Sequence, residues 1–206
     1  MVPSRMDHLI EGYRRYRQER WPNLRSLHLK LAQGGQSPRV LIIACCDSRV
    51  DPATIFDAGP GELFVIRNVA NLAPPFELGG GYHGASAAIE FAVDTLLVDT
   101  VLVLGHAQCG GVAAALAAPD HPTTFLGHWL GLLDPAKERI KGAVGDPHTA
   151  LEYESIKVTL ENLLTFPFVR RRVEAGELVL KGARYGVADG TLELYDAARG
   201  VFEAVA

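Results

Sequence analysis

The chain has 206 residues and a mass of 22.3 kDa, which suits one domain or a domain with a terminal arm. Its 20 Lys and Arg against 24 Asp and Glu give a net charge of −4, which argues against nucleic-acid and anionic-membrane partners because these attract a basic face. With 48% hydrophobic and 21% charged residues the chain is globular rather than disordered, and three cysteines are too few for a disulfide framework.

Within residues 1–33, residues 5–32 are charged and amphipathic, with leucines and tyrosines at helical spacing that Pro22 interrupts. They predict one or two helices forming an N-terminal arm. The segment lacks the apolar stretch of a secretory signal, and no apolar run in the chain reaches membrane-spanning length. We therefore expect a cytoplasmic protein that associates with no membrane.

Short continuous β-branched runs predict three strands buried on both faces, over residues 40–45, 63–66 and 100–105. Between the last two, apolar residues recur at helical spacing over 85–97, after a glycine-rich loop. Alternating strands and helices favour an α/β fold with a mostly parallel central sheet and flanking helices.

The last third of the chain predicts a helix over 152–164, followed by strands over 178–187 and 191–195 joined by a tight turn. These two strands would give the sheet an antiparallel C-terminal edge. We expect the α/β domain to occupy residues 34–206.

Chemically active side chains follow two of the predicted strands. The first strand runs into residues 45–49 (CCDSR), and the third runs into residues 106–111 (HAQCGG). Ligands of open parallel sheets bind outside the carboxyl ends of the strands. We therefore expect the reactive residues of the two segments to meet in one crevice: Cys45, Asp47, Arg49, His106 and Cys109.

Two thiolates and one imidazole, from Cys45, Cys109 and His106, are good zinc ligands, and three protein ligands leave the fourth position free for water. Two other interpretations fit the spacing equally well: a structural site with a fourth protein ligand, and buried reduced cysteines without a metal. Cys46 points away from Cys45 along an extended chain, so we expect it to pack rather than to bind the same metal.

The motif Cys45-x-Asp47-Ser48-Arg49, followed by His106-x-x-Cys109-Gly110-Gly111, resembles the β-class carbonic anhydrases. The resemblance runs from about residue 34 to the end and includes segments 61–71, 87–92 and 177–190. It implies reversible hydration of carbon dioxide to bicarbonate and a proton, by attack of a zinc-bound hydroxide. Cys45, His106 and Cys109 would hold one Zn²⁺ per subunit.

The resemblance also makes Asp47 and Arg49 the family's catalytic dyad, in which Arg49 clamps the carboxylate of Asp47 and Asp47 orients the hydroxide. Gln36 and Phe64 match positions that line the carbon dioxide pocket in the plant-type branch. Phe91 stands where that branch usually has a tyrosine, so the ring is kept and the hydroxyl is lost.

A second branch of the family is gated by bicarbonate, through a tryptophan, an arginine and a tyrosine. Here Arg67 and Tyr185 match, but Ile42 replaces the tryptophan and offers no hydrogen-bond donor. We therefore expect the ungated form, with Asp47 paired to Arg49, and with Arg67 and Tyr185 in structural roles.

The family assembles as dimers and dimers of dimers, so we expect a homodimer or tetramer in which residues 5–32 pack on the neighbouring subunit.

Two other functions remain open. One is a hydrolase of carbonyl sulfide or carbon disulfide on the same scaffold, since these molecules are linear and apolar like carbon dioxide. The other is a non-catalytic zinc-binding or sensor protein, against which the presence of Asp47 and Arg49 argues.

Overall fold

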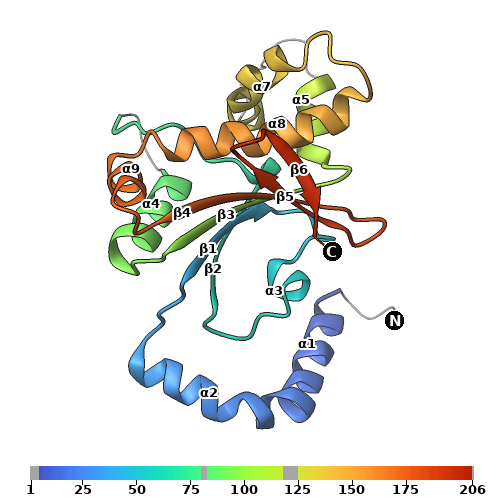
Figure 1. The fold of residues 1–206 in the computed structure, drawn as a ribbon. Coiled ribbons are helices and arrows are strands. Elements are labelled where there is room, and N and C mark those ends of the chain that lie inside the picture. The colour runs from blue at the N-terminus through green and yellow to red at the C-terminus, as the bar shows by residue number, and fades with distance from the viewer. Residues whose placement is uncertain (1–4, 80–82, 118–124, 206) are drawn as a thin grey trace. The chain divides into compact units, whose positions relative to one another are not determined.

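A computed structural model describes residues 5–79, 83–117 and 125–205 of the chain (Figure 1). The chain divides into two compact units, one ending at Ser37 and the other beginning at Pro38. The first unit holds α1 (Arg5–Arg15) and α2 (Trp21–Gly34), joined by a wider helical turn over Tyr16–Arg20. Pro22 lies in the first turn of α2, where its missing N–H breaks no helical hydrogen bond.

The second unit is built on a six-stranded sheet in the order β2-β1-β3-β4-β5-β6. The first four strands are parallel to one another: β1 (Val40–Cys45), β2 (Leu63–Asn68), β3 (Thr100–His106) and β4 (Val179–Tyr185). Next to them, β5 (Leu192–Asp196) and β6 (Val201–Ala204) run antiparallel. The predicted α/β fold with an antiparallel C-terminal edge is confirmed, and β6 extends that edge beyond the predicted hairpin.

The two predicted helices of this unit are also present. The helix over 85–97 corresponds to α4 (Gly84–Glu90), which continues as a wider turn over Phe91–Thr95. The helix over 152–164 corresponds to α8 (Pro147–Leu163), which begins earlier than predicted because the Asp146 carboxylate accepts hydrogen bonds from the first backbone N–H groups.

The remaining helices are short. They are α3 (Pro52–Ile55), α5 (Gly110–Ala117), α6 (Phe125–Leu130), α7 (Asp134–Arg139) and α9 (Pro167–Glu174), with single turns over Val69–Asn71 and Gly131–Leu133. No helix in the described part of the chain combines the length and hydrophobicity needed to cross a membrane.

Both faces of β1 and β3 are buried, as their continuous apolar runs predict. The same prediction is wrong for β2, which lies at the edge of the sheet and leaves Val65 38% exposed. On one face Ile43 and Val103 pack with Ile156 of α8, which lies across β3 and β4 (Figure 1). On the other face Ile42 and Leu104 belong to a separate apolar cluster that includes residues of α3. The sheet is therefore held rigidly, and so are the residues at its strand ends.

The helix α8 packs closely against the sheet where β3 and β4 carry the glycines Gly105 and Gly182. A Cβ added at Gly182 of β4 would lie 2.7 Å from Cγ2 of Ile156 and 3.2 Å from Cβ of Tyr195. A Cβ added at Gly105 of β3 would lie 2.8 Å from Cδ1 of the same isoleucine. The absence of side chains at these two positions allows the close contact between α8 and the sheet.

We expect Gly182→Ala to lower the free energy of unfolding by about 1–3 kcal/mol, because the added methyl group overpacks the contact with Ile156. Gly84→Ala is the matched control, since a Cβ at Gly84 meets no atom within 4 Å, and it should be neutral or slightly stabilising. Urea unfolding followed by circular dichroism measures both. A Gly182→Ala protein as stable as the wild type would contradict this account of the packing.

Candidate metal centre

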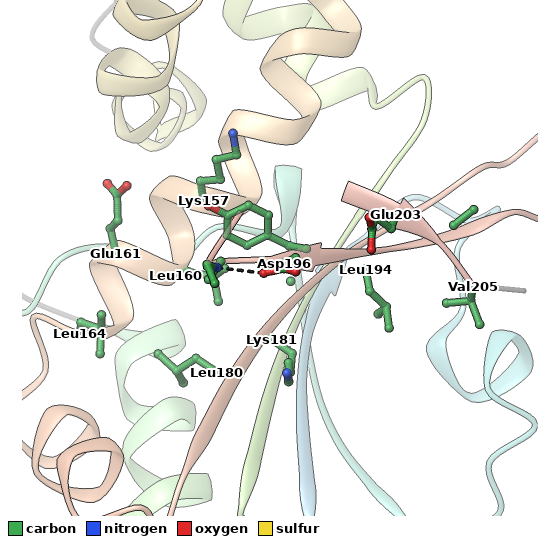
Figure 2. Close-up of a pocket in the computed structure, with 15 residues that line it drawn as sticks. Lys157, Leu160, Glu161, Leu164, Leu180, Lys181, Leu194, Asp196, Glu203 and Val205 are labelled. Atoms are coloured by element: carbon green, nitrogen blue, oxygen red, sulfur yellow. Dashed lines mark hydrogen bonds between the residues drawn. The ribbon is translucent and has the colours of Figure 1, made fainter. Parts of the chain in front are cut away.

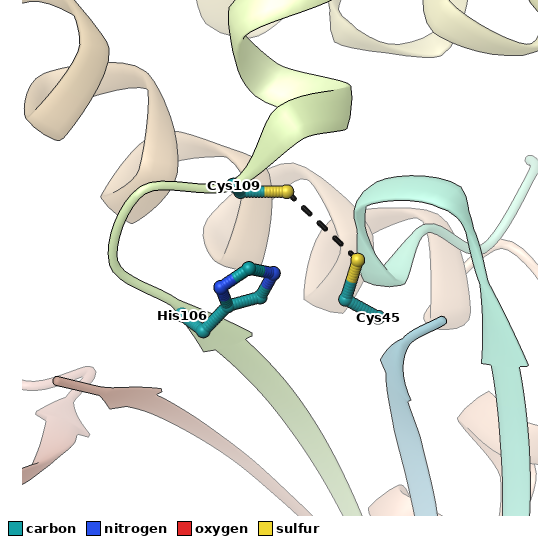
Figure 3. A group of neighbouring side chains, drawn as sticks. All are labelled: Cys45, His106 and Cys109. Atoms are coloured by element: carbon teal, nitrogen blue, oxygen red, sulfur yellow. Dashed lines mark hydrogen bonds between the residues drawn. The ribbon is translucent and has the colours of Figure 1, made fainter. Parts of the chain in front are cut away.

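Three potential metal ligands meet at the carboxyl ends of β1 and β3 (Figure 3). Strand register pairs Ala44 with Leu104, so Cys45 and His106 end neighbouring strands almost level with each other. Cys109 reaches them from the loop before α5. The ligand atoms of these three side chains all lie within 4.8 Å of one another, and all three residues are buried.

The geometry of this group fits a zinc ion. The two sulfur atoms lie 3.9 Å apart, and two sulfurs at about 2.3 Å from a tetrahedral zinc stand about 3.8 Å apart. Nδ1 of His106 lies 2.8 Å from the carbonyl oxygen of Ala107, to which only a protonated nitrogen can donate. In the neutral ring Nε2 then carries the lone pair, and this atom is buried without a hydrogen-bond partner among the described residues.

The thiols of Cys45 and Cys109 shift each other's pKa in opposite directions. A hydrogen bond from the Cys109 thiol lowers the pKa of Cys45 below its usual range, against the opposing effect of burial, and His106 adds to the lowering. The pKa of Cys109 is raised, because its thiol is hydrogen-bonded to Cys45 and buried. The two thiols therefore share a proton, and a divalent cation bound between them would displace it.

A carboxylate held by an arginine lies beside the ligands. Arg49 donates from Nε to Oδ1 of Asp47 at 2.9 Å and from Nη2 to Oδ2 at 2.8 Å. Hydrogen bonds from Arg49 hold the pKa of Asp47 well below its usual range. Nη2 of Arg49 also donates to the Gln108 carbonyl at 3.0 Å, which ties the two ligand loops together. Oδ2 of Asp47 lies 4.0 Å from Nε2 of His106.

Arg67 supports the same loop from β2. Its guanidinium donates to the carbonyl oxygens of Cys45 at 3.0 Å, Asp47 at 2.7 Å and Val50 at 3.0 Å. Tyr185 packs against the apolar cluster on the α3 side of the sheet. These three bonds agree with the structural role expected of Arg67, and the role of Tyr185 stays a prediction.

Two of the three predicted substrate-pocket residues, Phe64 and Phe91, lie away from the ligands of the same chain. The rings of Phe64 and Phe91 are 5.9 Å apart. Phe64 pairs with Leu41, four residues before Cys45 along β1, which places it about 13 Å from the ligand end of the sheet. Gln36 belongs to the N-terminal unit, where it is exposed. Their predicted role stays a prediction.

The expectation that Cys46 packs in the interior is wrong, because this thiol is exposed. The alternation of side chains holds only along an extended strand, and β1 ends at Cys45. Beyond that residue the chain turns into the Asp47–Arg49 loop, and Cys46 faces outward.

Three residues around Cys109 were not expected: His148 and Glu152 of α8, and Arg184 of β4. Glu152 accepts a hydrogen bond from the Cys109 N–H at 3.3 Å and from Nη2 of Arg184 at 2.8 Å. The sequence did hold one signal, since Glu152 stands at helical spacing with Ile156 and Leu163 on a buried stripe.

A hollow of about 810 Å³ lies elsewhere, between α8 and strands β4–β6 (Figure 2). Its lining mixes leucines with charged side chains, among them Lys157, Lys181 and Glu203. It contains none of the predicted site residues.

Comparisons with known proteins agree with the geometry. The family model for carbonic anhydrases matches residues 40–192. Beta carbonic anhydrase 3 of Arabidopsis thaliana is 34% identical over 200 residues, which cover 93% of this chain and 77% of that protein. The structure of the β-carbonic anhydrase CcaA matches with a TM-score of 0.89 and 34% identity, covering 98% of this chain and 100% of that one. A tetrameric β-carbonic anhydrase of Sordaria macrospora matches with a TM-score of 0.82 and 25% identity, over 98% of each chain.

The adjacent cysteines offer a matched pair of variants. We expect Cys45→Ala to lose zinc, because it removes one of three protein ligands. Cys46→Ala should keep the zinc content of the wild type, because the Cys46 thiol is exposed and outside the ligand group. Elemental analysis after dialysis against a chelator measures this. Retention of zinc by Cys45→Ala, or its loss from Cys46→Ala, would show that the ligands are assigned incorrectly.

Proposed function

This chain belongs to the β-class carbonic anhydrases, and from that premise we infer that it is a zinc lyase that converts carbon dioxide and water reversibly to bicarbonate and a proton. The observation that carries this conclusion is the buried group of Cys45, His106 and Cys109 with the Asp47–Arg49 pair beside it. The relatives are named as carbonic anhydrases, which favours this function over carbonyl sulfide or carbon disulfide hydrolysis and over a non-catalytic zinc role.

Zinc held by these ligands supplies a Lewis acid that lowers the pKa of bound water and so provides a nucleophile near neutral pH. The ionised Asp47 carboxylate only accepts hydrogen bonds, so it orients the proton of a neighbouring water away from the substrate. Arg49 keeps Asp47 ionised and fixes its plane through two parallel N–H···O bonds. We propose these as the roles of the dyad.

We propose that Gln36, Phe64 and Phe91 line the carbon dioxide pocket of a neighbouring subunit. Phe64 is far from the ligands of its own chain, and Phe91 remains 43% exposed although it is a large aromatic residue. α1 also exposes an apolar stripe at helical spacing, formed by Met6, Leu9, Ile10 and Tyr13. A homodimer, or a dimer of dimers as in the tetrameric Sordaria macrospora relative, would cover these surfaces.

We assign the chain to the ungated, plant-type branch. Asp47 is engaged by Arg49, and Arg67 is engaged by three backbone carbonyls, so neither is free for the gating arrangement. The similarity to the Arabidopsis thaliana relative supports the same branch.

We also propose a cytoplasmic location. The ligand sulfurs lie 3.9 Å apart, and their oxidation to a disulfide would remove two of the three ligands. A compartment that keeps thiols reduced protects such a site.

We expect Asp47→Asn to lower kcat/KM for carbon dioxide hydration by about 10²-fold or more, because the amide no longer acts only as an acceptor. Zinc content should stay at the wild-type level, since Asp47 is outside the ligand group. Asp99→Asn is the matched control, because Asp99 is likewise paired to an arginine, with Nε of Arg39 at 2.7 Å, but lies before β3. Stopped-flow hydration with a pH indicator measures both. Equal rates for Asp47→Asn and the control would contradict the role of the dyad.

Subunit mixing tests whether the aromatic residues act across an interface. We expect Phe91→Arg and Cys109→Ala to be inactive alone, the first through a charge in the apolar pocket and the second through loss of a ligand. Random mixing should restore about a quarter of the wild-type activity, because half of the dimers then contain one complete site. Activity that stays at background after exchange, with hetero-oligomers detected by mass spectrometry, would place Phe91 in the site of its own chain.

A further inference from the structure

A buried carboxylate meets the peptide of one predicted zinc ligand. Oε1 of Glu152 lies 3.3 Å from the backbone nitrogen of Cys109, and Glu152 is only 2% exposed. We propose that Glu152 is a positioning residue of the zinc centre, which holds the Cys109 peptide so that its sulfur faces the other two ligands. This inference rests on the proposed function and adds a residue that touches neither zinc nor substrate.

The carboxylate is oriented by a cation of its own. Arg184 of β4 donates to Oε2 of Glu152 from Nε at 3.0 Å and from Nη2 at 2.8 Å. Nη1 of Arg184 donates to Glu193 of β5 at 3.0 Å, and Tyr153 donates to that same carboxylate. Since Arg184 occupies Oε2, the other oxygen of Glu152 stays available for the Cys109 N–H. Pairing of this kind is what allows a charged group to remain buried.

The same helix also contacts the other side of the peptide. Nε2 of His148, one turn before Glu152 on α8, lies 3.0 Å from the carbonyl oxygen of Cys109. Nδ1 of His148 lies 3.5 Å from Oε1 of Glu152. The backbone N–H and C=O of Cys109 therefore both contact side chains of α8, and the carbonyl also accepts from the Ala113 N–H at 3.0 Å.

Cys109 needs such support more than the other ligands do. Cys45 and His106 end strands whose ladders fix their backbone, whereas Cys109 follows a loop in which Gln108 has a φ of +57°. Its backbone N–H precedes α5 and has no partner within the helix. Partners that hold a metal ligand from outside the coordination sphere change metal affinity by about 10–100-fold when they are removed.

Two double variants separate positioning from simple stabilisation. Glu152→Gln/Arg184→Met and Glu152→Met/Arg184→Met both remove the buried ion pair, so no charge stays at position 152, and both leave Glu193 without Arg184 to the same extent. They differ in one respect, since only glutamine keeps an oxygen that can accept from the Cys109 N–H. The pair Glu203→Gln/Arg199→Met removes an exposed ion pair near β6 and is the control for loss of charge.

Competition with a chromophoric chelator should show zinc bound about 10–100-fold more weakly by the Glu152→Met variant than by its Glu152→Gln counterpart. The sulfur-to-metal bands of the cobalt-substituted protein should shift in the methionine variant alone, and urea unfolding of the two metal-free proteins should coincide. The control pair should bind zinc like the wild type. Equal zinc affinities and superimposable cobalt spectra would overturn the proposal, as would an affinity loss matched by an equal loss of metal-free stability.

A second measurement needs only the isosteric Glu152→Gln protein. The Cys109 amide resonance should move upfield, because a neutral acceptor replaces a charged one. An unmoved resonance would overturn the proposal even where the methionine variant fails to fold. Failure of the wild-type chain to bind zinc would instead overturn the proposed function, so the two results are distinguishable.

Discussion

The parallel pairing of β1 with β3 is the constraint on which the rest of the site depends. Residues 45 and 106 are far apart along the chain, and only the register that aligns Ala44 with Leu104 places both at the same edge of the sheet. A slip of one residue would move one ligand by about 3.3 Å along the strand, which is large against the 4.8 Å within which all three ligand atoms lie. Each face of the two strands packs in its own apolar cluster, so a slipped strand would place its side chains against neighbours that they do not fit.

Arginines then hold the loops that leave this edge. Arg67 binds the carbonyls of the loop after β1, and Arg49 bridges Asp47 to the carbonyl of Gln108 in the loop after β3. A loop that carries ligands has few backbone partners of its own, and a planar guanidinium can satisfy several carbonyl or carboxylate oxygens at once. The candidate metal centre is therefore rigid although two of its supporting segments are loops.

Much of this could be predicted from the sequence, where local pattern and topology agree. The run VLIIAC defines β1 with the bounds that the structure shows, and the strand ends supply the ligand group. The sequence could not show which helix supports Cys109, because Glu152 is 43 residues away and joins it only through the packing of α8. The sequence also did not predict the strand β6, because this run of four residues is too short to be recognised and is strand only through its pairing with β5. The distance of Phe64 from the ligands could be predicted from the sequence. Phe64 is the second residue of its strand, whereas the ligands lie at the carboxyl ends of the neighbouring parallel strands.

The charges of the site balance in separate groups. Two thiolates would neutralise a zinc ion, Asp47 is matched by Arg49, and Arg184 is shared by Glu152 and Glu193. The product bicarbonate is an anion, whereas carbon dioxide is neutral. A centre whose cations are each occupied by a partner attracts the product less strongly than one with a free arginine. Arg49 donates from Nε and Nη2 to Asp47 and from Nη2 to the Gln108 carbonyl. The hydrogen bonds that orient Asp47 therefore also weaken the attraction of Arg49 for the bicarbonate product.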